Sequence, residues 1–287
     1  MKEELRFAKY QGTGNDFVMV LDLADERPLE GPRAASLCDR RFGVGADGTI
    51  RVVARGSGFF MDHRNADGST AEMCGNGARC VGAFLRDEGV TDVEAFDLHA
   101  GSGVRRVERT DGDRFTVHMG TPRFPKSTIP MRGPAWETFL EQRLDLGGGI
   151  EVTASALSMG NPHLVLFVDE DPGRYHVAHI GPELERDERF PEGVNVEFAH
   201  VLDDASIDVR VWERGSGETM ACGSGACAVA VAGNEAGRTG SRCVVRFPGG
   251  DLEVERREDG EVLLTGDAVR VFDGVVDVGG LAPLDRP

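Results

Sequence analysis

The chain has 287 residues and carries 49 acidic against 32 basic side chains, a net charge of −17. Hydrophobic residues make up 40% of it, as in a soluble globular protein with one large or two ordinary domains. The acid excess argues against binding to nucleic acid or to an anionic membrane. No apolar run approaches the roughly 20 residues that span a bilayer.

The N-terminus begins Met1-Lys2-Glu3-Glu4, is acidic and leads straight into strand-like sequence. We therefore expect no signal peptide and a cytoplasmic location. In that reducing compartment the cysteines are expected to be free thiols: Cys38, Cys74, Cys80, Cys222, Cys227 and Cys243. Because the chain has only three lysines, few residues could hold a pyridoxal cofactor.

The first part of the chain is predicted to be strand-rich with one dominant helix. An apolar run begins at Asn15, and the run 59–61 indicates a strand. A helix follows over 78–85, and Gly89 is typical of a residue just past a helix end. Short β runs over 104–117 are broken by an Asp111-Gly112 turn.

The second part shows the same pattern after a proline-rich segment that ends in Gly147-Gly148-Gly149. A second apolar run begins at Asn161, and 207–212 alternates as a half-buried strand does. A helix over 226–232 stops before Gly237, and β runs over 244–264 contain an Asp259-Gly260 turn. Both predicted helices are apolar over most of their surface, so we expect them to be central and wrapped by strands.

An ordered series of matches indicates an internal duplication. The runs at Asn15 and Asn161 are 146 residues apart, and Asp47 matches Asn195 at an offset of 148. At that second offset Cys74-Gly75-Asn76-Gly77-Ala78 matches Cys222-Gly223-Ser224-Gly225-Ala226. We therefore predict an α+β fold of two pseudo-symmetric domains, each a β-sheet around a central helix. The predicted domains are 1–130, with 275–287 packed on it, and 131–274.

A cysteine begins each central helix, next to glycines. A helix N-terminus offers unpaired N–H groups and the positive end of the helix dipole, which lower the pKa of a thiol and can bind a carboxylate. If two such helix ends face one another, one sulfur could remove the α-proton of an amino acid while the other protonates the opposite face. That reaction inverts the α-carbon without a cofactor.

Other interpretations fit less well. Zinc sites prefer closer spacing than Cys74 to Cys80 or Cys222 to Cys227, so we expect no metal. The glycines at 223–228 fit a dinucleotide fingerprint only formally, because no strand precedes them directly. A redox role for Cys74 with Cys222 stays open. A purely structural role, in which each cysteine is a small buried residue in a glycine turn, would explain one such motif but explains two matching motifs poorly.

The motifs resemble the diaminopimelate epimerase family of pyridoxal-independent enzymes. The matching segments lie in the family's order over 11–227, so they cover most of the chain. They are Gln11-Gly12-Thr13-Gly14-Asn15-Asp16-Phe17, Asn65-Ala66-Asp67-Gly68-Ser69, Glu72-Met73-Cys74-Gly75-Asn76-Gly77-Ala78-Arg79, Gly160-Asn161-Pro162-His163, Gly193-Val194-Asn195-Val196-Glu197 and Glu213 through Cys227.

The resemblance implies a cytoplasmic homodimer that interconverts LL- and meso-diaminopimelate for lysine and cell-wall precursor synthesis, with no cofactor. It implies Cys74 and Cys222 as the acid–base pair, and His163 and Glu213 as residues that tune the thiols. Its implied substrate-binding residues are Asn15, Asn65, Gly75, Asn76, Asn161, Asn195, Glu213, Arg214, Gly223 and Ser224. Arg214 suits a distal carboxylate and Glu213 an ammonium.

Two positions depart from the family pattern. Some members have a substrate-contacting glutamine where this chain has Gly48, and Phe272 stands where a tyrosine associated with the dimer contact is common. Two alternatives are another racemase of this type, for histidine or proline, and a non-catalytic amino-acid-binding or thiol-redox protein. Proline racemases usually have histidine where this chain has Asn76.

Overall fold

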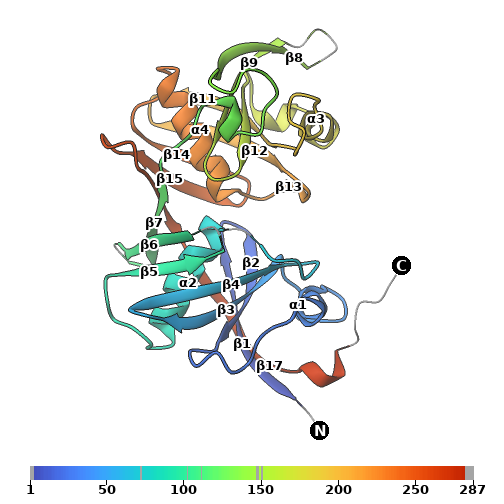
Figure 1. Ribbon diagram of the computed structural model, residues 1–287, viewed down its shortest axis with the longest axis vertical. Helices are drawn as coiled ribbons and strands as arrows, with labels where there is room; N and C mark the ends of the chain where they lie inside the picture. Colours follow the sequence, from blue (N-terminus) through green and yellow to red (C-terminus); the bar gives the residue numbers. More distant parts are fainter. Residues whose placement is uncertain are drawn as a thin grey trace. The chain divides into compact units, whose positions relative to one another are not determined.

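The computed structural model describes residues 3–71, 73–101, 103–110, 112–146, 149 and 151–281. The chain forms two compact units, Met1–Val117 with Gly266–Pro287, and His118–Thr265 (Figure 1). Six residues named above lie outside the described residues, as does the part of 275–287 from 282 on: Met1, Lys2, Glu72, Asp111, Gly147 and Gly148.

The first unit contains strands from both ends of the chain and two α-helices. Its elements are β1 (Glu4–Gly12), β2 (Asn15–Leu21), α1 (Gly31–Cys38), β3 (Gly48–Arg55), β4 (Gly58–Asn65), α2 (Gly75–Asp87), β5 (Ala95–Ala100), β6 (Gly103–Arg109), β17 (Val269–Asp277) and the 3₁₀ turn η3 (Val278–Gly280). The strand β7 (Arg114–Gly120) begins in this unit and ends in the second.

The second unit repeats this composition and is continuous in sequence. Its elements are η1 (Lys126–Thr128), β8 (Phe139–Asp145), β9 (Glu151–Ser158), β10 (Pro162–Phe167), η2 (Pro172–Arg174), α3 (Val177–Glu185), β11 (Asn195–Asp203), β12 (Ser206–Glu213), β13 (Gly217–Thr219), α4 (Gly223–Glu235), β14 (Arg242–Phe247) and β15 (Gly250–Arg256). The strand β16 (Val262–Asp267) begins here and ends in the first unit.

The order of strand pairings is the same in the two units. In the first, β17–β1 and β1–β2 are antiparallel, β2–β3 parallel, β3–β4 antiparallel, β4–β5 parallel, and β5–β6 and β6–β7 antiparallel. In the second, β8–β9–β10–β11–β12–β14–β15–β16 repeat these directions pair by pair. The predicted α+β fold of two duplicated halves is confirmed.

The unit boundaries lie earlier than the sequence analysis placed them. They fall at 117/118 and 265/266, whereas the expected domains were divided at 130/131 and 274/275. The reason is β17, which pairs with β1 from Glu4↔Asp277 to Gln11↔Val269 and so occupies in the first unit the place of β8 in the second. A cut after residue 274 would divide this strand.

A nearly all-buried helix lies at the centre of each unit. Every residue of α2 from Gly75 to Leu85 is buried, and α4 is buried over its whole length except Ser224 and its last two residues. In Figure 1, strands surround α4 in the second unit, as they do α2 in the first. Gly89 and Gly237 follow the two helices with φ of +64° and +65°, the left-handed conformation that commonly ends a helix. Both helix predictions are confirmed.

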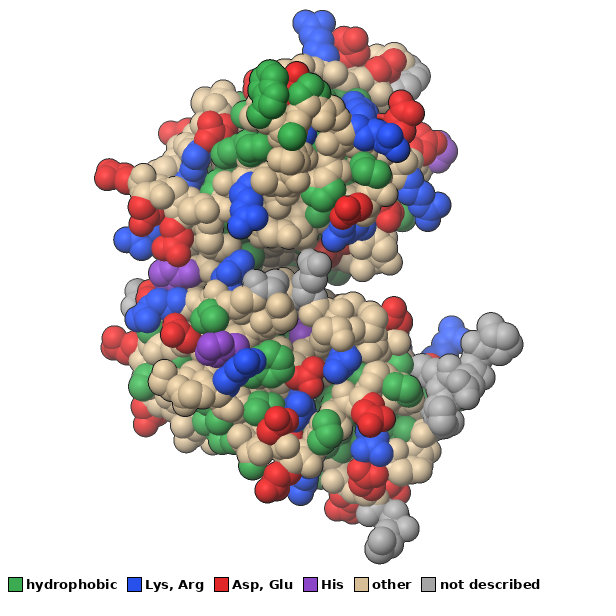
Figure 2. Space-filling view, in the orientation of Figure 1, with side chains coloured by type: hydrophobic (Ala, Val, Ile, Leu, Met, Phe, Trp, Pro, Cys, Tyr) green, Lys and Arg blue, Asp and Glu red, His purple; other side chains and the backbone are tan. Residues whose placement is uncertain are grey.

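Charged side chains of both signs lie on the surface of each unit. On the face drawn in Figure 2, acidic and basic side chains are interspersed over each unit. Within the described residues, no helix combines the length and apolar character needed to cross a membrane. The candidate site residues are grouped where the two central helices begin.

Candidate functional site

Two cysteines occupy equivalent N-terminal capping positions. Cys74 precedes α2 with φ −112° and ψ 117°, and Cys222 precedes α4 with φ −125° and ψ 119°. Each sulfur accepts a hydrogen bond of 3.4 Å from the backbone N–H three residues on, at Gly77 and Gly225. Cysteine is not a common cap, and here the thiol takes the place that a serine or aspartate oxygen usually fills. Both sulfurs are thus held beside the first turn of a buried helix.

The Asn15 side chain lies next to Cys74. Asn15 is the first residue of β2, and its Oδ1 accepts from the Cys74 sulfur at 3.7 Å and from Asn76 Nδ2 at 3.4 Å. Arg79 is completely buried, and its guanidinium donates to Asn76 Oδ1 at 3.1 Å, which fixes the orientation of that amide. The structure therefore brings Asn15, Cys74 and Asn76 together, as predicted.

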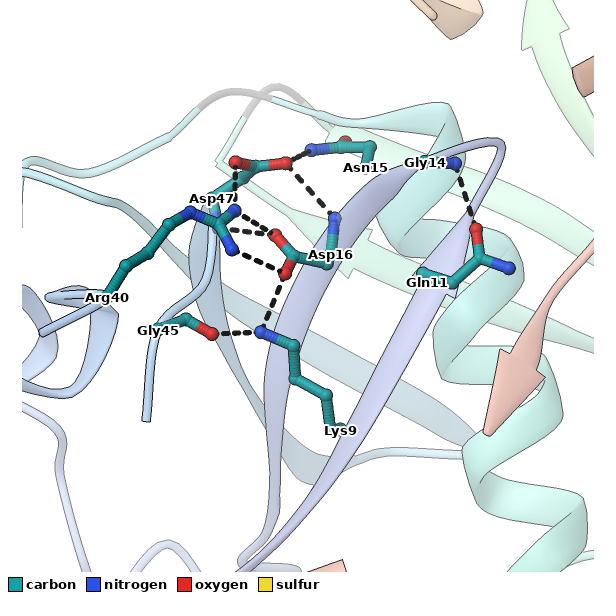
Figure 3. A network of polar contacts seen from close by, with 8 residues as sticks. All are labelled: Lys9, Gln11, Gly14, Asn15, Asp16, Arg40, Gly45 and Asp47. Carbon is teal, nitrogen blue, oxygen red and sulfur yellow. Dashed lines mark hydrogen bonds and ion pairs between the residues drawn. The ribbon is translucent and has the colours of Figure 1, made fainter. Parts of the chain in front are cut away.

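An ionic network fixes the orientation of Asn15 (Figure 3). Asn15 Nδ2 donates to Asp47 Oδ2 at 2.9 Å, and Arg40 bridges Asp47 at 2.9 Å and Asp16 at 2.7 Å. Buried Lys9 donates to Asp16 at 2.8 Å and also to the Gly45 carbonyl. Because Asp47 Oδ2 accepts from Nδ2, the amide oxygen of Asn15 is the atom that faces Cys74.

The same network stabilises the charged form of Asp16. Burial alone would raise the pKa of this carboxyl, but the hydrogen bonds from Arg40 and Lys9 outweigh it and lower the pKa to about 2. These ions were not among the predicted site residues, although Asp16 lies in a segment that carries the family motifs and Asp47 is the repeat match of Asn195. The four ions are separated in the sequence by ordinary strand and turn residues, so no local pattern indicates that they form one network.

Asn65 and Gly48 lie opposite one another where β4 ends and β3 begins. Asn65 is exposed, and its Nδ2 donates to Ser69 Oγ at 2.9 Å. A Cβ placed on Gly48 would lie 2.6 Å from the backbone oxygen of Arg64, closer than packed atoms approach. The strand pairing thus excludes a larger residue at the position where some relatives have glutamine.

In the second unit a chain of contacts leads to Cys222. Ser224 Oγ lies 3.5 Å from the Cys222 sulfur and accepts from Asn161 Nδ2 at 3.2 Å. Asn161 Oδ1 in turn lies 2.9 Å from His163 Nε2. The predicted residues Asn161, His163, Cys222 and Ser224 are therefore contiguous.

Glu197 is a member of this group that the sequence analysis missed. Its side chain and that of His163 are both 0% exposed, and Glu197 Oε1 lies 2.6 Å from His163 Nδ1. A Cβ on Gly225 would lie 2.8 Å from the same carboxylate oxygen and 3.4 Å from the Cys222 sulfur, so glycine is needed for this approach. The available signal was the spacing: Glu197 follows Asn195 by two residues on the same strand and so points to the same face.

A second carboxyl, Glu213 at the end of β12, also lies beside Cys222 and hydrogen-bonds to it. Thr219 Oγ1 donates to Glu213 Oε1 at 2.5 Å. Burial raises the pKa of Glu213. The predicted proximity of Glu213 to a thiol is present in the structure.

The acidity of Cys222 differs from the expectation for a helix N-terminus. Burial raises the pKa of the Cys222 thiol well above its ordinary value, and the charges of Glu213 and Glu197 raise it further. The hydrogen bonds from Ser224 and the Gly225 N–H lower it but are outweighed. The predicted lowering was wrong for this thiol because the helix end is buried between two carboxyl groups.

Asn195 and Arg214 meet, but through the backbone. Asn195 is 4% exposed; its Nδ2 donates to the Pro162 carbonyl at 2.8 Å and its Oδ1 accepts the Arg214 backbone N–H at 2.9 Å. The Arg214 guanidinium donates to the Glu192 carbonyl at 3.2 Å. Asn195 thus ties the end of β12 to the start of β10.

As for metals, no group of three His, Cys, Asp or Glu side chains within the described ranges could hold an ion.

Comparison with known sequences gives a consistent result. The sequence profile of the diaminopimelate epimerase family matches residues 7–125 and 155–271. The chloroplastic diaminopimelate epimerase of Oryza sativa subsp. japonica is 43% identical over 281 residues, covering 94% of this chain and 79% of the rice protein. The diaminopimelate epimerase of Desulforudis audaxviator is 45% identical over 277 residues, covering 94% of this chain and 98% of its own.

Solved structures share the architecture at much lower identity. The crystal structure of a hydroxyproline epimerase from Agrobacterium vitis, with bound trans-4-hydroxy-L-proline, matches with a TM-score of 0.68 at 14% identity. The match covers 96% of this chain and 91% of that one. At such identity the likeness concerns the fold alone.

Proposed function

Because this chain belongs to the diaminopimelate epimerase family, we propose that it is an isomerase that interconverts LL- and meso-diaminopimelate in the synthesis of lysine and cell-wall precursors. The observation that carries the proposal is the pair of cysteines that cap α2 and α4 in the same backbone conformation, each with a glycine N–H on its sulfur.

Cys74 and Cys222 are the proposed acid–base pair. Inversion requires one group to remove the α-proton and a second to deliver a proton to the opposite face of the same carbon. A thiolate is the base and a thiol is the acid, and the two exchange roles when the reaction runs backwards. Neither step requires a cofactor.

The α-carboxylate is assigned to the first-turn amides of the two helices. Gly75 and Asn76 begin α2, and Gly223 and Ser224 begin α4, where N–H groups have no acceptor within the helix. Such donors would bind the carboxylate and stabilise the negative charge that develops as the α-proton leaves. Each donor of this kind contributes about 10²–10³-fold to a rate.

The remaining assignments follow the contacts on each unit. Asn15 and Asn161 adjoin the two cysteines, which supports substrate binding close to the reacting carbon. Arg214 and Asn65 are assigned to the distal end of the substrate, where a guanidinium suits a carboxylate. Asn195, also in the substrate-binding set, holds the Arg214 backbone. His163 and Glu213 are assigned to tuning the thiols.

The test is isotope exchange in deuterated water under reducing conditions. LL-diaminopimelate should be inverted with uptake of deuterium at the α-carbon, whereas proline and histidine should show neither. Exchange with proline or histidine instead would assign a different racemase, and exchange with none would refute the isomerase.

Substitution separates the two thiols from the other cysteines. Cys74→Ala and Cys222→Ala should each lower inversion at least ~10³-fold, since a proton-transfer group is removed. Cys243→Ala is the control, because Cys243 is a buried β14 residue of the second unit. Full turnover in either alanine variant of Cys74 or Cys222 would refute the two-thiol assignment.

We also propose a homodimer that uses the exposed side of β17. Four apolar residues of this strand are 46–57% exposed, which is unusual for an edge strand: Val269, Val271, Phe272 and Val275. Phe7 supports Phe272 with its ring edge-on, the centroids 6.0 Å apart. Phe272→Lys should shift the chain to monomer in sedimentation velocity, and an unchanged sedimentation coefficient would place the contact elsewhere.

A further inference from the structure

The contact between Glu197 and His163 requires a proton between the two side chains. His163 Nε2 faces Asn161 Oδ1 at 2.9 Å, and an amide oxygen only accepts, so Nε2 carries a hydrogen. If Nδ1 were then bare and Glu197 ionised, two acceptors would face each other at 2.6 Å. Either His163 is doubly protonated or Glu197 is a carboxylic acid, and in both cases the pair holds one extra proton.

That proton sets the direction of every hydrogen bond as far as Cys222. His163 Nε2 donates to Asn161 Oδ1, so the Asn161 amide turns its Nδ2 toward Ser224 Oγ at 3.2 Å. Ser224 Oγ accepts there, and its hydroxyl hydrogen is left to point at the Cys222 sulfur, 3.5 Å away. A chain that donates to sulfur stabilises the thiolate more than the thiol.

We propose that Glu197 is a positioning residue that holds a proton on His163 and thereby fixes the chain His163–Asn161–Ser224 with its donors directed at the Cys222 sulfur. This inference rests on the proposed function only in that the proposed function makes the Cys222 thiolate a base. It concerns Cys222 alone. At the repeat-equivalent positions the first unit has Phe17 and Thr49, which cannot form such a pair.

The pair also changes the electrostatics of the site. The titratable groups that act on Cys222 are Glu213 from β12 and Glu197 from β11, and His163 from β10 pairs with Glu197 and acts on Glu213. A bare Glu197 carboxylate would oppose the thiolate. The carboxylate charge of Glu197 by itself raises the pKa of Cys222. With the shared proton the positive charge held on His163 offsets it, so the net contribution of the pair is the hydrogen-bond direction.

Glu197→Gln distinguishes these two roles by the sign of one shift. Glutamine removes the charge and the extra proton while keeping the shape of the side chain. Neutral His163 can then carry its hydrogen on either nitrogen, so the chain can also run in reverse and accept a hydrogen bond from the thiol. The positioning role predicts that the pKa of Cys222 rises by about one unit, or ~tenfold less thiolate at a given pH below it. A bare charge predicts that it falls.

The readout is the pH dependence of Cys222 alkylation by iodoacetamide, followed on its own peptide by mass spectrometry without substrate. It is independent of turnover, so failure of the proposed function and failure of this inference are distinguishable. Glu170→Gln, which removes a carboxylate that is 58% exposed in the same unit, is the charge-matched control and should leave the Cys222 profile in place. A fall or no change in Glu197→Gln would overturn the proposal.

Ser224→Ala tests the route. In that background Glu197→Gln should no longer raise the pKa of Cys222, because the last link is gone; a persisting rise would overturn the route through Ser224. If Glu197→Gln does not fold, as judged by circular dichroism, Ser224→Ala alone decides. It should raise the pKa of Cys222 by a similar amount, and an unchanged profile would overturn the proposal.

Discussion

Replacing Asp16 with asparagine tests the ionic network behind Asn15. Asp16 is 18% exposed and accepts from Lys9 and Arg40, which hold its pKa at about 2 against an ordinary 3.8. A depression of this size corresponds to about 2 kcal/mol of folding stability at neutral pH. Asp16→Asn should therefore lower the free energy of unfolding by about that amount.

The pH dependence follows from the direction of the shift. A carboxyl whose pKa is lowered on folding contributes its full stability above the unfolded value, here near pH 4, and loses it as the pH falls toward 2. The difference between the parent chain and Asp16→Asn should thus be largest at pH 7 and should narrow steadily below pH 4.

The assay must report on the first unit. Both tryptophans, Trp136 and Trp212, lie in the second unit, so urea unfolding is followed by far-UV circular dichroism in place of fluorescence. Asp113→Asn is the control, since this carboxylate is 76% exposed and surface ion pairs contribute only about 0–1 kcal/mol. A loss for Asp16→Asn no larger than the control, or equal at pH 7 and pH 3, would refute the reasoning.

The repeated glycines allow two further predictions. Gly225→Ala directs a methyl group at Glu197 Oε1, 2.8 Å away, and should lower kcat at least ~tenfold. The nearest atom to the new methyl group of Gly77→Ala is the end of the flexible Ile50 side chain at 2.8 Å, so this variant should lose less kcat. Steady-state rates compare the two variants, and equal losses of kcat would contradict the predicted difference. Gly48→Gln, although it restores the residue of some relatives, should lower the melting temperature, because its Cβ would meet a β4 backbone oxygen at 2.6 Å; an unchanged or higher melting temperature would show that the β3–β4 pairing adjusts.

Much of the fold could be predicted because the sequence signals of each element occur in both halves of the duplication. The two glycine-flanked cysteines and the glycines at 89 and 237 mark both ends of each central helix, and the structure has these helices at Gly75–Asp87 and Gly223–Glu235. Local signals of this kind depend on backbone conformation within a few residues, which is why one sequence suffices to find them.

The features that were missed depend on contacts between distant segments. Residues 275–287 were expected to pack on the first domain, but a strand that begins at Val269 and pairs with β1 was not. This pairing joins residues more than 250 positions apart, and no local pattern of β17 distinguishes this partner from any other strand. The same holds for Glu197, whose burial against His163 is decided by the parallel pairing of β10 and β11. The raised pKa of Cys222 follows first from the burial of the thiol itself and then from the charges of Glu213 and Glu197, so a rule based on the helix end alone gave the wrong sign.

The place of β17 has a consequence for biosynthesis. A ribosome releases β1 long before β17, so the outermost pair of the first unit can form only after all the strands between them have emerged. The strands of the second unit from β8 to β16 all precede β17 in the chain. The closing step of the first unit therefore departs from the usual N-terminal-first order of co-translational folding, because this unit waits for a strand that is synthesised after the strands of the second unit.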